Sequence, residues 1–134
     1  MIPTFRFFHK HILECLNDDR EHRKSDLYDF LIHGLSLSQE DVNAKTKGGQ
    51  SKLQDRVSWS CAYLIKATAI ERVKPGVYRI TPLGKIMLND NHQVIDNYLL
   101  AHYCPNFSSY QYIPKRGVND KRYGPKSKRQ KYEI

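Results

Sequence analysis

Polar and basic side chains gather between residues 45 and 56, where a loop with two glycines leads into a predicted helix. Arg can hold guanine through two hydrogen bonds, Gln can do the same for adenine, and Asp can accept from cytosine. Lys is better suited to phosphates, which position a protein without reading sequence. We therefore expect DNA contacts from Lys45, Lys47, Gln50, Ser51, Lys52, Asp55 and Arg56.

A second candidate contact is the segment Lys74-Pro75-Gly76, which has turn chemistry and joins two short alternating stretches. This pattern predicts a β-hairpin whose turn touches the DNA backbone. Lys74 and Arg79 are suited to phosphates, and Gly76 and Tyr78 complete the expected contact surface. A solvated lysine is the alternative interpretation for any one of these cations.

Trp59 is the one tryptophan of the chain. Steps of roughly 100° per residue place it away from the apolar stripe of its helix. One interpretation has it contact a base or a thymine-like C5 methyl group. The other, which we favour from the sequence, packs Trp59 and Tyr63 under the hairpin or against the last helix.

Charge is unevenly distributed along the 134 residues, whose formal net charge is +8. Residues 42–85 carry +7 and residues 114–134 carry +6, whereas residues 1–41 carry −3 and residues 86–113 carry −2. Basic blocks attract polyanions because each neutralised phosphate releases counterions. In the last block, tyrosines interleave with cations suited to nucleic acid, and a linker is the alternative. Its candidate contacts are Lys115, Arg116, Lys121 and Arg122.

Hydrophobic periodicity and capping signals predict helices that position these residues. The first has Pro3 near its first turn and ends before Asn17. A second runs from an N-cap at Ser25 to Gly34 as the C′ residue, and a short helix or turn follows Ser38. A long helix capped by Ser51 reaches about Ala69.

The hairpin follows the long helix, and then come a helix opened by Thr81-Pro82 and a last helix over 94–102, stopped by Cys104-Pro105. This order predicts a mainly α fold with a small β-hairpin (α+β), a winged helix-turn-helix. We divide the chain into a DNA-binding domain (1–90), an additional helix (91–105) and a basic, tyrosine-rich tail or linker (106–134).

Other function classes find little support in the sequence. No nucleotide-binding, zincin or hydrolase motif is present, and the histidines lack metal-ligand spacing, so we expect no enzyme, metal or cofactor. The three cysteines lie far apart and are interpreted as buried thiols. No apolar run is long enough for a membrane span, which predicts a soluble, cytoplasmic protein.

Three motifs make the chain similar to a known family. Ile2-Pro3-Thr4, Arg56-Val57-Ser58-Trp59 with Tyr63-Leu64, and Gly76-Val77-Tyr78-Arg79-Ile80-Thr81 with Gly84 resemble the N-terminal domain of Mrr-type restriction endonucleases. The resemblance covers about residues 2–88. It implies a winged-helix DNA-binding domain joined to a nuclease domain that cuts foreign, often methylated, DNA. The Asp…Glu/Gln-x-Lys nuclease core of that family is not found in these 134 residues.

From residues and resemblance together we expect double-stranded DNA binding by the recognition module of a restriction system, with methylated or otherwise modified bases as candidate targets. A nuclease domain or subunit is the expected partner, and homodimerisation is left open. The alternatives are a winged-helix transcriptional regulator and a protein-docking or dimerisation module.

Overall fold

The computed structural model describes residues 8–108 of the chain, which fall into two compact units divided between Asp96 and Asn97. The elements of the first unit are α1 (Phe8–Cys15), the 3-10 helix η2 (Leu16–Asp18), β1 (His22–Arg23), α2 (Lys24–Gly34), α3 (Gln39–Asn43), α4 (Lys52–Lys66), β2 (Ile70–Lys74), β3 (Val77–Ile80) and α5 (Pro82–Asn89). Those of the second are α6 (Asn97–Tyr103) and α7 (Pro105–Ser108).

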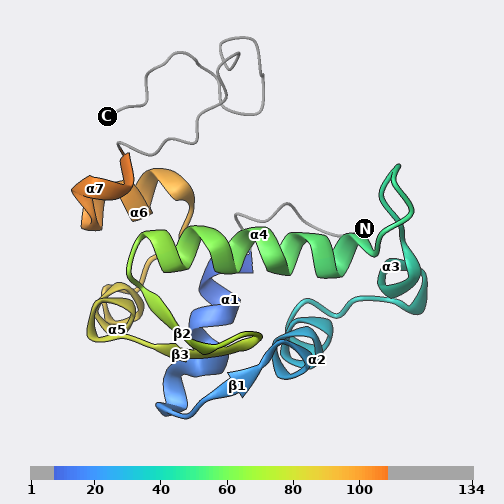
Figure 1. The fold of residues 1–134 in the computed structure, drawn as a ribbon, viewed down its shortest axis with the longest axis horizontal. Coiled ribbons are helices and arrows are strands. Elements are labelled where there is room, and N and C mark those ends of the chain that lie inside the picture. The colour runs from blue at the N-terminus through green and yellow to red at the C-terminus, as the bar shows by residue number, and fades with distance from the viewer. Residues whose placement is uncertain (1–7, 109–134) are drawn as a thin grey trace, which may run out of the picture. The chain divides into compact units, whose positions relative to one another are not determined.

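The three strands form one antiparallel sheet in the order β1-β3-β2 (Figure 1). Tyr78 of β3 lies opposite His22 on one side and Arg72 on the other, and a bulge shifts the register between Arg72 and Lys74. Helices α1, α2 and α4, the β2–β3 hairpin and the short strand β1 ahead of α2 make a winged-helix-like α+β fold. The predicted fold class and the β2–β3 hairpin are thus confirmed, whereas β1 was not predicted.

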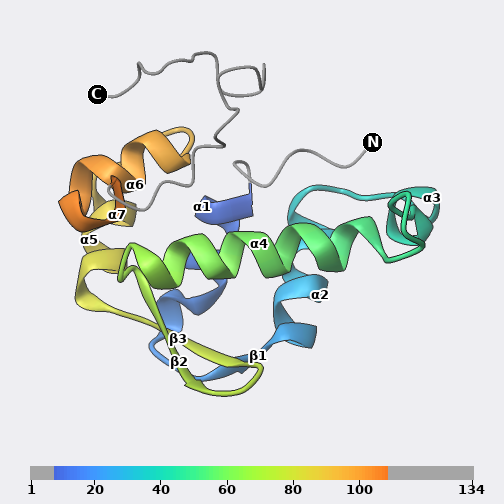
Figure 2. The ribbon, with the colours of Figure 1, turned by 45° about the horizontal axis from the view of Figure 1, so that its top comes forward.

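The core of the first unit lies where α1 crosses α2, α4 and α5, all of which contact it. Helix α4 is the longest helix of the described residues, and α1 passes behind it in Figure 2. Apolar stripes at helical spacing meet here because each helix buries one face. The fully buried side chains include Phe8, Ile12, Leu13, Leu16, Leu27, Leu31, Val57, Leu64 and Met87.

Three predicted helix starts are confirmed by their caps. Ser38 accepts from the Asp41 N–H at 3.1 Å, and the Asp41 carboxylate accepts in return from the Ser38 N–H at 3.1 Å. Ser51 accepts from the Gln54 N–H at 3.2 Å, and the Thr81 hydroxyl accepts from the Gly84 N–H at 3.2 Å. Each cap satisfies an amide that the helix leaves unpaired at its N-terminus.

The predicted ends of the second helix were wrong. Helix α2 begins at Lys24 because the Asp26 carboxylate accepts from the Arg23 N–H at 3.2 Å, so Ser25 lies inside the first turn. Gly34 is the last helical residue, and Ser36 instead adopts the left-handed conformation, with φ 51°. Gly34 packs closely on α1, since a Cβ there would lie 3.2 Å from His11 Cδ2.

Two further boundaries differ from the prediction. Helix α4 ends at Lys66 rather than near Ala69, because Thr68 turns into the left-handed region at φ 60° and leads into β2. In the second unit, α6 starts at Asn97 instead of Val94. Pro105 follows α6 but opens the short helix α7, consistent with the preference of proline for a first helical position. Pro3 lies outside the described residues.

Candidate nucleic-acid interface

Helix α4 separates a buried face from an exposed one. Leu53, Val57, Cys61 and Leu64 of the predicted apolar stripe are at most 3% exposed. Thr68, which helical spacing also places on this stripe, was wrong, because it lies beyond the end of α4 and is exposed. Gln54, Ser58, Trp59 and Lys66 are exposed, and Lys52, Asp55 and Arg56 are partly exposed. The polar candidate residues at the N-terminal end of α4 are therefore accessible to a ligand.

Trp59 is 52% exposed and stacks on Tyr63, with ring centroids 5.9 Å apart. The favoured interpretation, in which both rings are packed, was wrong for Trp59 and right for the burial of Tyr63, which is 6% exposed. An exposed indole held by a buried phenol is a rigid apolar surface in the middle of α4. The surface is available to a partner at low entropic cost.

The loop between α3 and α4 is tightly closed by main-chain hydrogen bonds. Thr46 N–H donates to Gln50 O at 2.7 Å, and Gly49 N–H donates to Thr46 O at 2.9 Å, with Gly49 at φ 87°. This turn extends beyond the N-terminal end of α4 (Figure 1). Its candidate contacts Lys45, Lys47 and Gln50 are all exposed. The loop thus presents these side chains from a defined backbone.

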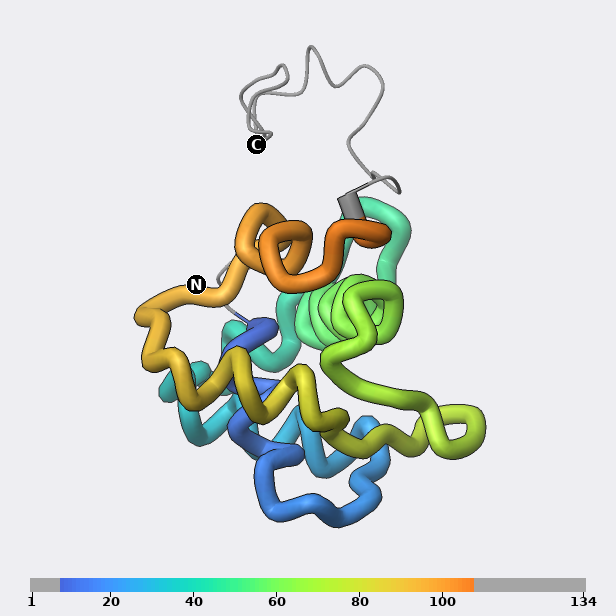
Figure 3. Tube along the Cα trace, turned by 90° about the vertical axis from the view of Figure 1, so that its left-hand side faces the viewer, coloured from blue at the N-terminus to red at the C-terminus, as the bar shows by residue number. Residues whose placement is uncertain are grey.

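The hairpin places its candidate contacts in different environments. Lys74 is exposed at the turn, where Gly76 adopts φ 77°, and this turn projects past the helices when α4 is viewed nearly end-on (Figure 3). Tyr78 is only 4% exposed, so its predicted contact with DNA is corrected: its ring belongs to the core. Arg79 donates to Glu71 at 2.9 and 3.1 Å and lies 4.0 Å from Glu21.

Lys24 joins the hairpin turn to α4 and was not singled out in the sequence. Its N–H donates to Gly76 O at 3.2 Å, and its ammonium donates to Ser58 Oγ at 3.0 Å. This role is hard to predict from the sequence, because Lys24 lies in the segment with net negative charge. Arg72 pairs with Tyr78 across the hairpin. Burial and the nearby Cys61 raise the pKa of Tyr78, and the positive charge of Arg72 counteracts part of this rise.

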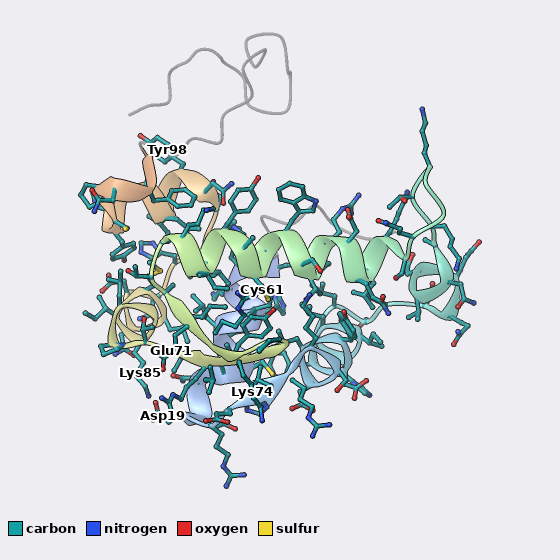
Figure 4. The ribbon with its side chains drawn as sticks, in the orientation of Figure 1. Asp19, Cys61, Glu71, Lys74, Lys85 and Tyr98 are labelled. Atoms are coloured by element: carbon teal, nitrogen blue, oxygen red, sulfur yellow. The ribbon has the colours of Figure 1, made fainter. Side chains whose placement is uncertain are left out.

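Cys61 points from α4 into the interior (Figure 4). Burial raises the pKa of its thiol to about 12, and the nearby charge of Lys24 only partly counteracts this. The interpretation of all three cysteines as buried is right for Cys61 alone, because Cys15 and Cys104 are partly exposed. A protonated, enclosed thiol is a poor nucleophile, so Cys61 packs rather than reacts.

Another group of ionisable residues lies at the start of α2. His22 shares hydrogen bonds with Asp18 at 3.0 Å and with Asp26 at 3.1 Å. Burial lowers the pKa of His22, but the hydrogen bonds with the two carboxylates outweigh it and raise the pKa above its ordinary value. Asp18, Asp26 and Asp29 line a shallow depression here, whose negative charge does not suit phosphates.

Within residues 8–108, no group of three or more His, Cys, Asp or Glu side chains is placed to hold a metal ion. In the same part of the chain, every helix is too short or too polar to cross a membrane. The tail candidates Lys115, Arg116, Lys121 and Arg122 lie outside the described residues.

Comparison with known families gives one match: the Mrr N-terminal domain, over residues 5–90. This range contains every described element of the first unit, from α1 to α5. Neither the curated proteins nor the solved structures yielded a match.

Proposed function

The chain belongs to the Mrr N-terminal domain family, and from this membership and its charged surface we propose that it binds double-stranded DNA as the recognition module of a restriction system. The observation that supports this most is spatial. The exposed face of α4 has a basic loop at its N-terminal end and is tied to a basic hairpin turn through Lys24. An α-helix fits the major groove, and the residues of its first turns reach furthest into it.

In this proposal the exposed lysines of the loop and the turn contact phosphates, and the start of α4 reads bases. Lys45, Lys47 and Lys74 have the first role. Arg79 shares it only when it leaves Glu71, whose carboxylate occupies its guanidinium in the free protein. The proposed base-reading residues are Gln50, Ser51, Lys52, Asp55, Arg56 and Trp59.

The finer parts of the proposal concern the target and the partner. We propose that modified duplexes, cytosine-methylated ones first, are bound in preference to plain DNA, and that a nuclease domain or subunit carries out cleavage. The exposed Trp59 ring supports a methyl contact, since apolar surfaces recognise the C5 methyl position of the major groove. The basic tail adds sequence-independent affinity in this scheme.

A fluorescence anisotropy titration with plain and cytosine-methylated duplexes tests the binding proposal. We expect log affinity to fall linearly with log salt concentration, because phosphate contacts release counterions. The double variant Lys45→Gln/Lys47→Gln should reduce this slope, and Lys85→Gln should not, since Lys85 is already paired with Asp19 at 2.9 Å (Figure 4). The absence of salt-sensitive binding to any duplex would overturn the proposal.

Two further measurements address the finer parts. Equal affinity for plain and methylated duplexes would contradict the recognition of modified bases but would not contradict DNA binding. Deletion of residues 114–134 should lower the salt slope without changing the preferred duplex. A change of preferred duplex would instead make the tail a reader of sequence.

A further inference from the structure

Lys24 is the residue through which three elements of the proposed interface meet. It is the first residue of α2, its N–H bonds to the carbonyl of Gly76 in the hairpin turn at 3.2 Å, and its ammonium bonds to Ser58 of α4 at 3.0 Å. The backbone amide of Lys24 makes the first of these hydrogen bonds, and its side-chain ammonium makes the second. The ammonium is therefore tied to α4, and the main chain of the same residue is tied to the turn.

The charge of this ammonium is not neutralised by an ion pair within residues 8–108, where its hydrogen-bond partner is the neutral hydroxyl of Ser58. Two other cations of the domain differ in this respect. Arg79 is paired with Glu71 and Lys85 with Asp19, both at 2.9 Å. Lys24 thus presents an ammonium that no carboxylate within residues 8–108 pairs with.

Ser58 lies on the exposed face of α4, between Gln54 and Ala62 along the helix. If α4 enters a groove by this face, phosphates border the groove on both sides, and the hairpin turn approaches one of them. Lys24 lies between the face and the turn. Its ammonium also needs little ordering to contact a phosphate, because Ser58 already restrains it.

We propose that Lys24 is a further contact to the DNA backbone, held between α4 and the hairpin turn by Ser58. This inference rests on the proposed DNA-binding function and adds to it a residue from the acidic first third of the chain. Lys24 positions the turn through its main chain and binds a phosphate through its side chain. Ser58 holds the side chain in place.

The test compares salt slopes of duplex binding for the full chain and its variants, by anisotropy between about 50 and 200 mM salt. Lys24→Gln should lower the slope by about 0.9, the value for one phosphate, and Lys24→Arg should restore it. Lys85→Gln is the matched control and should leave the slope unchanged. Circular dichroism and thermal melts check that each variant is folded. Lys24→Gln removes the ammonium and its bond to Ser58 but keeps the Lys24 N–H that bonds to Gly76.

A second variant changes the hydrogen-bond partner of the Lys24 ammonium on α4. Ser58→Asp places a carboxylate beside Lys24 and should lower the slope without altering α2, since an exposed position accepts the change. If the wild type binds and Lys24→Gln leaves the salt slope unchanged, the role of Lys24 alone is overturned. Should Lys24→Gln fail to fold, an unchanged slope in Ser58→Asp has the same meaning. A wild-type chain that binds no duplex overturns the proposed function and this inference together.

Discussion

His9 Nδ1 and Ser60 Oγ share a hydrogen bond of 2.5 Å that links α1 to α4 where both side chains are fully buried. The His9 ring also meets the edge of Tyr63, with centroids 6.1 Å apart. Tyr63 in turn supports the exposed Trp59. A polar contact in the core is thereby connected, side chain by side chain, to the outer face of the helix.

Ser60→Ala should lower the free energy of unfolding by about 1–3 kcal/mol, because it removes a buried hydrogen-bond partner of His9. Urea denaturation followed by circular dichroism measures the change. Ser25→Ala, at an exposed position in α2, is the control and should shift the midpoint little. Equal effects of the two substitutions would contradict a special role for the buried bond.

Gly84→Ala should also destabilise the fold, by roughly 1–3 kcal/mol. A Cβ at this position would lie 2.2 Å from Ala69 O and 2.8 Å from Ile80 Cγ1, so α5 could no longer approach the end of α4 and the hairpin as it does. Thermal denaturation checks this against Gly48→Ala, where the nearest atom would be Thr46 Oγ1 at 3.8 Å. We expect the melting temperature to fall for the first variant only.

His22 should make stability depend on pH. Its pKa is raised in the folded chain, so its contribution is complete below its ordinary value near 6.5 and is lost as pH rises through the folded value. The stability difference between wild type and His22→Asn should therefore shrink as pH rises above about 6.5. Urea titrations on both sides of this value measure it, and a constant difference would contradict the effect.

Trp59→Ala should weaken duplex binding by about 1 kcal/mol, roughly half the value for burying a whole large apolar side chain. The salt slope should stay as in wild type, because an apolar contact releases no counterion. Lys47→Gln provides the opposite pattern, with a reduced slope. A reduced slope in Trp59→Ala would show that the indole acts by arranging phosphate contacts instead.

The features predicted correctly from the sequence are those that depend on neighbouring residues. The caps at Ser38, Ser51 and Thr81 each act on an amide three residues ahead. The hairpin follows from alternation around Pro75 and Gly76, and the α4 stripe follows from helical spacing. The cap at Ser25 was wrong because Asp26, also local, competes for the same start of a helix.

The features missed depend on residues far apart in the chain. Strand β1 has two residues, and it pairs with β3 more than fifty positions later, so its own sequence carries almost no strand signal. Val77, Tyr78 and Ile80 of β3 are all buried, so alternation along the strand does not identify the covered face, which tertiary packing decides. Lys24 gains its place from Ser58 and Gly76, neither of which is a sequence neighbour.

The bond from Lys24 N–H to Gly76 O has a consequence for how the domain tolerates sequence change. Main-chain amides are common to every residue except proline, so substitution of Lys24 by almost any residue keeps the turn attached to α2. Lys24→Pro would keep the helix start but remove this attachment. Side chains around the turn can therefore diversify, and with them the DNA contacts we propose, while the scaffold that aims them stays the same.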